Sequence, residues 1–315
     1  MKRIITLLAI VCSLTAITLA CCGNDESHQR HFAATQSEEP IRSTETNGIT
    51  TFIFPCYEYS ALEVSSIFHV AMCDTVDSIR VFVSNELVDK LEVRINKETL
   101  IIGLNNATFK RTKKEPIARV LLPYNLKLSA VTLSGAADFH TALPIRGNTF
   151  RINQSGASSL KADYIQASKI NLELSGASTC RSDLRGTSID LTASGASNYL
   201  GNMRCKEGTL SLSGASGIKG NIETPALELA LSGATNTRLA GKADEVELRL
   251  SGTAELKGGD LSTRVMTGKM SGASNAKVNC TERIAIELSG TSNLKYTGNA
   301  ENHCTASKMA NVSRF

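Results

Sequence analysis

The chain has no tryptophan, and aromatic residues of all kinds make up 5% of its 315 residues. A bulky globular core therefore has little to be built from, whereas thin, regular layers of aliphatic side chains need no large rings. The net charge is only +4 and no compact basic motif stands out, so composition argues against a nucleic-acid-binding protein. The length permits one elongated domain or two ordinary ones.

Metal-binding motifs are also missing. The nine cysteines form no CxxC pair, and no histidine except His303, next to Cys304, stands at metal-ligand spacing from a cysteine. We therefore predict no metal site and no cofactor. An exported protein can pair its cysteines, and the sequence leaves open whether disulfides or buried thiols are formed by the six beyond residue 22. These six are Cys56, Cys73, Cys180, Cys205, Cys280 and Cys304.

The first twenty residues read as a targeting signal. Lys2 and Arg3 precede the apolar run Ile4–Ala20, which is too short to span a membrane comfortably. Ala20 directly before Cys21 resembles the lipobox of bacterial lipoproteins. We predict a signal peptide over residues 1–20 and a lipidated Cys21, whose several acyl chains would anchor the protein stably. The alternative is an ordinary secretory signal.

The anchor predicts an outer-membrane location, on the cell surface or the periplasmic face. The stretch Asn24–Glu26 resembles a surface-export signal of some diderm bacteria, which favours the surface. Residues 21–48 are polar and turn-prone, so we expect a flexible tether.

A Ser-Gly pair recurs nine times in the remaining chain. Its serines are spaced 18 to 21 residues apart, and such a period is typical of stacked repeats. They are Ser134, Ser155, Ser175, Ser194, Ser213, Ser232, Ser251, Ser271 and Ser289.

The residues around each serine alternate in polarity. Apolar side chains stand three before, one before and five after it, as Leu172, Leu174 and Cys180 do around Ser175. Gln154, Ala193 and Gly268 are exceptions. Alternation with period two indicates strands with one face inward, and no helical period appears.

These spacings predict an all-β fold, a single-stranded, right-handed parallel β-helix, or solenoid, of about nine coils of 19–20 residues. We place the repeat at residues 131–296, a β-rich lead that caps its first coil at 49–130, and a C-terminal cap at 297–315. The charged run Lys110–Lys114 is expected to be a solvated loop.

The Ser-Gly pair then has a structural task. A glycine can adopt positive φ in a tight corner where a Cβ would meet the next coil, and stacked hydroxyls can bond along the ladder. A nucleophilic serine needs a base, and five histidines cannot serve nine serines. We predict no catalytic residue.

Six residues after the serine, seven of the nine repeats carry a basic residue. Stacking would align these residues into a stripe, and two interpretations stay open: a binding track for an acidic polysaccharide or lipopolysaccharide phosphate, or a solvated face that discourages edge association. The stripe consists of Lys161, Arg181, Lys219, Arg238, Lys257, Lys277 and Lys295.

From Ile49 to Tyr296 the order of motifs resembles the auto-transporter adhesin family with a head GIN domain. The motifs are "LEVSSIFHVAM", "LEVRINKETLIIG", "IARVLLPYNLKLSAVTLSGAADF" and the repeated "SGAS". The resemblance implies a β-helical fold, an envelope location, often with a lipoprotein anchor, and an adhesin role without catalytic residues.

The leading hypothesis is a non-enzymatic envelope lipoprotein, an adhesin-like binding or structural rod for glycan or another polyanion. The alternatives are a polysaccharide-active β-helix enzyme and a self-associating envelope scaffold. An enzyme would need carboxylates clustered with basic residues in one cleft, but the candidates fall in different columns and coils. They are Asp163, Asp183, Glu173, Glu228 and Glu287.

Overall fold

A computed structural model describes residues 38–105 and 116–315. The predicted signal peptide, Cys21, the first part of the tether and the run Lys110–Lys114 lie outside these residues. Within them the chain is strands joined by tight turns, with one short 3-10 helix, η1 (Asn85–Lys90). No helix of the described part is long and apolar enough to cross a membrane.

The strands fall into three groups along the chain. The N-terminal group is β1 (Arg42–Thr46), β2 (Ile49–Phe54), β3 (Ala61–Val64), β4 (His69–Cys73), β5 (Ile79–Ser84), β6 (Leu91–Asn96), β7 (Thr99–Leu104) and β8 (Ala118–Pro123). The repeat contains β9 (Ala130–Leu133), β10 (Asp138–Thr141), β11 (Ile145–Gln154), β12 (Ser159–Leu174), β13 (Thr179–Arg185), β14 (Ser188–Ala193), β15 (Asn198–Leu200), β16 (Met203–Arg204), β17 (Glu207–Leu212), β18 (Gly217–Leu231), β19 (Asn236–Leu250), β20 (Glu255–Met270), β21 (Asn275–Leu288) and β22 (Asn293–Thr297). The last group is β23 (Glu301–Asn302), β24 (Thr305–Ala306) and β25 (Asn311–Arg314).

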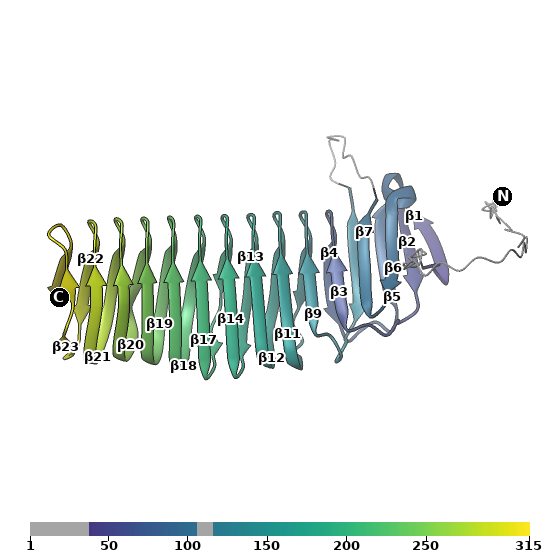
Figure 1. Cartoon of the computed structure of the whole chain (residues 1–315). Coiled ribbons are helices and arrows are strands. Elements are labelled where there is room, and N and C mark those ends of the chain that lie inside the picture. The colour runs from purple at the N-terminus through teal and green to yellow at the C-terminus, as the bar shows by residue number, and fades with distance from the viewer. Residues whose placement is uncertain (1–37, 106–115) are drawn as a thin grey trace, which may run out of the picture. The chain divides into compact units, whose positions relative to one another are not determined.

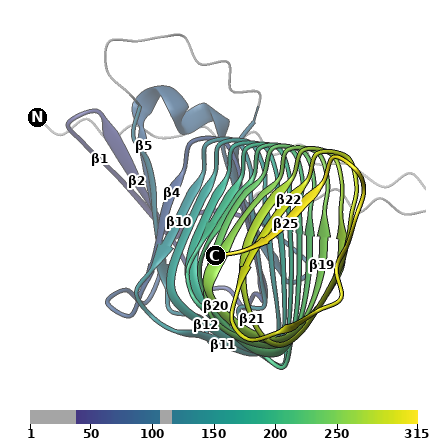
Figure 2. The ribbon, with the colours of Figure 1, turned by 90° about the vertical axis from the view of Figure 1, so that its left-hand side faces the viewer.

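Every coil follows the same path around the axis of a parallel β-solenoid (Figures 1 and 2). A strand runs into the Ser-Gly corner on what we call the leading face, and the next strand leaves it on the trailing face. A third face returns the chain to the leading face. Successive coils pair in parallel register, Leu172 with Leu191 and Leu191 with Leu210 on the leading face. The predicted all-β solenoid is confirmed.

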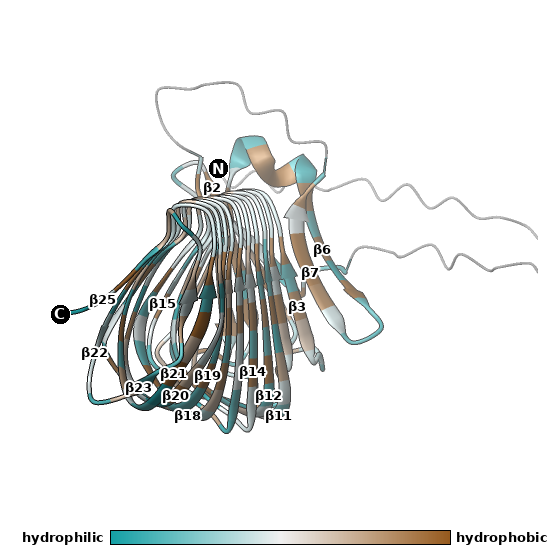
Figure 3. Ribbon diagram, turned by 60° about the vertical axis from the view of Figure 1, so that its left-hand side comes forward, coloured by the Kyte–Doolittle hydropathy of each residue, from teal (hydrophilic) through white to brown (hydrophobic). Residues whose placement is uncertain are grey.

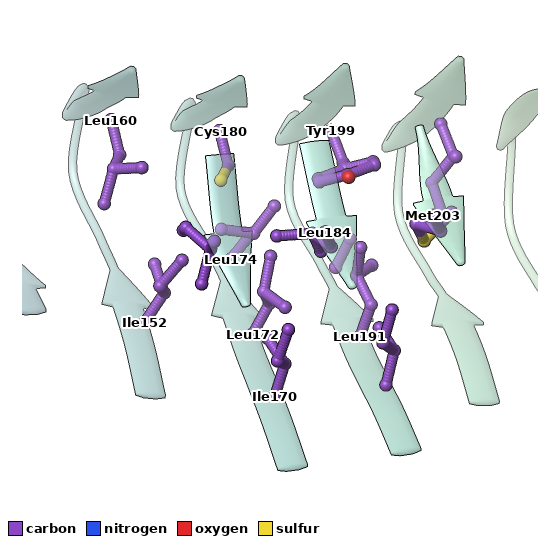
Figure 4. Packing of buried hydrophobic residues seen from close by; sticks show 14 of the residues in the cluster. Ile152, Leu160, Ile170, Leu172, Leu174, Cys180, Leu184, Leu191, Tyr199 and Met203 are labelled. Carbon is purple, nitrogen blue, oxygen red and sulfur yellow. The ribbon is translucent and has the colours of Figure 1, made fainter. Parts of the chain in front are cut away.

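The core is a set of aliphatic columns inside the coils. Leu172 and Leu174 are each 1% exposed, and Cys180 is fully buried, as their alternation predicts. Figure 4 shows these side chains inside the coils, lined up beside those of neighbouring coils, and in Figure 3 hydrophobic and hydrophilic residues alternate along the strands. Since each coil contacts mainly the coils beside it, stability is distributed along the stack.

The corner glycines are required by the stacking. Gly195 has φ of +68°, and a Cβ placed there would lie 2.5 Å from the carbonyl oxygen of Gly176 in the preceding coil. That oxygen accepts a hydrogen bond from the amide of Ala196 at 2.7 Å. The same pattern recurs from Gly156 to Gly290. A side chain at this position would therefore break the ladder at the corner.

A tenth coil precedes the nine that the Ser-Gly spacing predicts. Its corner is Ser65-Ser66, and Ser66 takes the glycine position with φ of +70°. The amide of Ala136 donates to the Ser66 carbonyl at 2.6 Å. Because serine replaces glycine at this corner, a search for the Ser-Gly pair does not find this coil.

The N-terminal segment caps the stack in an order that differs from chain order. The β3–β4 coil lies between the β9–β10 coil and strands β7 and β8, with all these pairs parallel. Beyond them the pairing becomes antiparallel, β6 on β7 and β5 on β8, followed by β2 and β1. The open edge of the parallel stack is thereby covered, because β6 pairs onto it on the leading face and β5 pairs onto it on the trailing face.

Both ends of the chain depart from the expected boundaries. Residues 42–46, which the sequence assigns to the tether, form β1 and pair with β2 through a turn at Asn47 and Gly48. Residues 297–315 continue the stack as a shorter coil, because β24 pairs with β21 and β25 with β22 in parallel. Its corner begins at Ser307 but has no glycine.

Candidate binding face

The seven basic residues stand in one straight column on the trailing face. Pairing register links them coil by coil, from Lys161 to Arg181 and from Lys219 through to Lys295, and Leu200 alone interrupts the series. All seven are exposed. Neighbours along the column are therefore one strand spacing apart, about 4.8 Å along the stack. We call this series the cationic column.

Most of these charges have no acidic partner. Among the described residues, only Lys257 of the cationic column has a carboxylate within 4.0 Å, that of Glu255 at 3.1 Å. Like charges stacked this closely repel one another, and the repulsion is relieved only by solvent or a bound anion.

Several basic residues on the other two faces are neutralised by ion pairs, although others, such as Arg151 and Lys169, have no carboxylate within 4.0 Å among the described residues. Lys269 lies 3.0 Å from Glu287 on the leading face, and Arg249 is paired with Glu247 there. On the third face Arg264 contacts Glu245 at 2.8 Å and Glu282 at 2.9 Å, which raises the pKa of its guanidinium. The trailing face is the one on which unpaired cations stack in register from coil to coil.

A second polar column lies beside the cationic column on the trailing face. Its residues stand four positions after each corner serine, whereas those of the cationic column stand six positions after it. It is mainly uncharged, with asparagine in five coils, and its only acids are Asp138 and Glu255. The asparagines are Asn198, Asn236, Asn275, Asn293 and Asn311. The Nδ2 of Asn311 donates to Oδ1 of Asn293 at 3.2 Å. We call this the asparagine column; its amides offer both donors and acceptors.

Several corner serines donate hydrogen bonds to the main chain of the preceding coil. The Ser175 hydroxyl donates to the Gln154 carbonyl at 3.1 Å, and that of Ser232 to the Leu212 carbonyl at 3.2 Å. A further column, three residues after the corner serine, is buried, and the hydroxyl of Ser197 there donates to the Ser194 carbonyl at 2.7 Å. The sequence signal for it was the constant small residue that follows Ser-Gly-Ala.

Two of the candidate catalytic carboxylates, Asp183 and Glu287, are held by neighbouring side chains. Both oxygens of Asp183 accept hydrogen bonds from Asn202, at 2.9 Å from its amide and 3.2 Å from its Nδ2. Glu287 is paired with Lys269, while Glu228 and Glu173 lie on the leading face three and six coils before it. Asp163 lies in the coil next to Asp183, so these two are closer neighbours than the sequence suggested.

The six cysteines of the described part are free thiols. Burial raises the pKa of Cys180 to about 12, and burial also raises the pKa of Cys205. Such thiols stay protonated and unreactive. His303 lies 3.5 Å from Glu301, and the described residues contain no group of three or more candidate metal ligands.

Comparison with known proteins settles the family. The model of the family described as putative auto-transporter adhesin, head GIN domain, matches residues 58–207 and 187–300. The chain belongs to this family. No curated protein matches it.

A solved structure of a similar protein shares the fold of this GIN-domain chain. A putative adhesin from Parabacteroides merdae ATCC 43184 is 17% identical, with a TM-score of 0.50 over 85% of this chain and 97% of that one. A putative adhesin from Parabacteroides distasonis ATCC 8503 is 17% identical with a TM-score of 0.47, and a putative lipid binding protein from the same strain is 14% identical with a TM-score of 0.48. Both cover the same shares of the two chains.

Proposed function

We propose that this chain is a non-enzymatic, lipid-anchored envelope protein that holds polyanionic glycan along the cationic column. The observation that carries the proposal is the alignment of unpaired cations: six of the seven cations in the column lack a carboxylate partner in the described part of the chain and stack in register. Unpaired cations on the leading face, such as Arg151 and Lys169, stack on uncharged residues instead. A linear polyanion laid along the stack would meet one cation per coil.

The repeat suits a repetitive ligand. Coil after coil presents the same outward chemistry at a constant spacing, so each added unit of a polymer makes the same contact and the contacts add in avidity. Acids on the leading face, among them Asp190, Glu228 and Glu247, would repel the same polymer. Binding is therefore directed to the trailing face.

Charge reversal tests this function. We expect Lys219, Lys257 and Lys277 changed together to Glu to weaken binding of polygalacturonate by at least about tenfold at low salt, because three attractive contacts become repulsive. The matched control reverses three ion-paired cations elsewhere, Lys242, Arg249 and Lys269. Isothermal titration calorimetry that finds equal losses in both variants would refute the assignment to this face.

The anchor and location need separate experiments. Cys21 is the proposed lipidation site, and metabolic labelling with a palmitate analogue should mark the wild type but not Cys21→Ala, which should also leave the membrane fraction. Protease treatment of intact cells then distinguishes display on the cell surface from the periplasmic face. A Cys21→Ala protein that still partitions with membranes would contradict the anchor.

A further inference from the structure

The trailing face is not uniform along the stack. A depression of about 600 Å³ opens in its last coils, lined among others by Lys257, Lys277 and Lys295 of the cationic column and by Asn275 and Asn293 of the asparagine column. Ligand sites for small molecules span about 300–1,000 Å³.

A bulge in the chain builds one wall of this depression. Gly258 pairs with Val278 and Ser262 pairs with Asn279, so the three residues of β20 between them have no partner in β21, although Asp260 and Leu261 stay paired with β19. They carry Gly259 and the exposed Asp260 outward beside Lys277. Bulges of this kind redirect side chains and are frequent next to functional sites.

The groups in the depression make different demands on a ligand. Lys277 and Lys295 have no carboxylate partner within 4.0 Å in the described residues, and they call for an anionic group. Glu255 and Asp260 line the same space and would repel a bare anion, but they accept hydrogen bonds from hydroxyl groups. The two asparagine amides can donate and accept. A molecule with one carboxylate and several hydroxyls satisfies all of them.

An aromatic ring stands at the edge of this group. The Lys277 ammonium lies 4.1 Å from the centre of the Phe315 ring, and Phe315 is 52% exposed. The amide of Phe315 donates to the Tyr296 carbonyl at 3.1 Å, and this bond positions the backbone from which the ring extends. Its exposed surface offers an apolar platform for the carbon-bound hydrogens of a sugar ring.

We propose that these coils form a subsite for one acidic sugar residue, with its carboxylate at Lys277 and Lys295, its hydroxyls at Asn275, Asn293, Glu255 and Asp260, and its ring against Phe315. This inference rests on the proposed function and deepens it: the remaining column attracts the polymer by charge alone, whereas this end recognises the sugar. Inorganic phosphate and sulfate lack the hydroxyls and should compete poorly.

Trigalacturonic acid is the probe, with its methyl ester as the uncharged form. We expect Asn275→Ala with Asn293→Ala, and separately Phe315→Leu, each to weaken trigalacturonate binding by about fivefold or more, as loss of about 1 kcal/mol would. The control is Asn198→Ala with Asn236→Ala, which changes the same column outside the depression. The methyl ester and equimolar phosphate should bind or compete weakly.

Binding of polygalacturonate, measured on the same variants, separates the two proposals. We expect the asparagine and Phe315 variants to keep most of their affinity for the polymer, because the cationic column is intact. If the control pair weakens the trisaccharide as much as the test pair while the polymer still binds, the subsite is wrong and the binding face stands. If the wild type binds neither ligand, the proposed function fails and the subsite with it.

Discussion

At the scale of single residues, glycine and buried titratable groups determine what the coil tolerates. The corner glycines hold a left-handed conformation that costs an L-residue about 1–2 kcal/mol, before any clash with the coil beside it. Not every glycine in the stack is constrained in this way. A Cβ at Gly147 would meet nothing closer than the Thr149 carbonyl oxygen at 3.7 Å.

We predict that Gly195→Ala lowers the free energy of unfolding by at least about 2 kcal/mol, because the conformational cost adds to the approach toward the Gly176 carbonyl. Gly147→Ala is the control and should change it by about 0.5 kcal/mol or less. Urea denaturation followed by circular dichroism measures both. Equal effects would contradict the role assigned to the corner.

Buried titratable groups predict a loss of stability at alkaline pH. Burial raises the pKa of Cys180 from 9.0 to about 12, and burial, with Cys180 and Asp183 nearby, raises the pKa of Tyr199 well above its usual range. The unfolded chain therefore loses these protons at lower pH than the folded chain does. The free energy of unfolding should be unaffected by these groups below their unfolded pKa values and should fall as pH rises above about 9.

Urea midpoints measured from pH 7 to 11 test this, with Cys180→Val as the comparison. Removing the thiol removes its share of the proton release, so the variant should lose less stability between pH 9 and 11 than the wild type does. Parallel curves would show that Cys180 does not contribute to the alkaline loss.

At the scale of strands and coils, columns matter more than individual positions. Gln154 occupies an inward position between Leu133 and Leu174 and is 2% exposed. Its Nε2 donates to the Thr179 carbonyl at 3.1 Å, but its Oε1 has no hydrogen-bond partner among the described residues. A buried polar atom left without a partner costs about 1–3 kcal/mol.

We expect Gln154→Leu to raise the free energy of unfolding by about 1 kcal/mol, since leucine has a similar volume and restores the apolar column. The reverse change, Leu174→Gln in the same column, should destabilise. Thermal and urea unfolding of the two variants would contradict this account if Gln154→Leu proved the less stable protein.

The coil itself is the unit that can be removed. Deleting residues 195–213 joins Ser194 to Gly214, keeps every inward column in register and removes Leu200, so Arg181 would stack on Lys219. We predict a folded protein shorter by about one strand spacing, 4.8 Å, with undiminished binding of polygalacturonate. Deleting only residues 195–204 should prevent folding, because half a coil cannot close. Circular dichroism and small-angle scattering distinguish these outcomes.

Periodic features of these elements could be predicted from sequence, and aperiodic ones could not. Leu172, Leu174 and Cys180 lie where their alternation places them, because each column repeats the same constraint ten times. The Ser65-Ser66 coil escaped detection since a single serine replaces glycine. The placement of that coil between β7–β8 and β9–β10 depends on pairing between distant segments, which leaves no local signal.

The candidate site likewise has one feature that could be predicted from the sequence and two that could not. The cationic column follows from a fixed spacing after each serine, so its alignment was predictable. Which cations are neutralised was not, because that depends on acids in other coils, as for Lys269 and Glu287. Likewise the depression near Lys277 arises from a bulge that changes the register of one coil only.

At the scale of the whole molecule, charge is sorted by face. The modest net charge of +4 conceals a trailing face that carries unpaired cations and a leading face on which acids outnumber bases. Salt should weaken binding of a polyanion to such a face steeply, because exposed charges are screened over about 8–10 Å at physiological ionic strength.

The most direct test of the cationic column as the binding face is a lysine footprint on the unaltered protein. Acetylation of exposed lysines, quantified by mass spectrometry with and without polygalacturonate, compares the column with lysines on the other faces in one sample. We predict protection of Lys219, Lys257, Lys277 and Lys295, no protection of Lys242 or Lys269, and none anywhere with neutral dextran. Protection spread evenly over all faces, or confined to Lys242 and Lys269, would contradict the account.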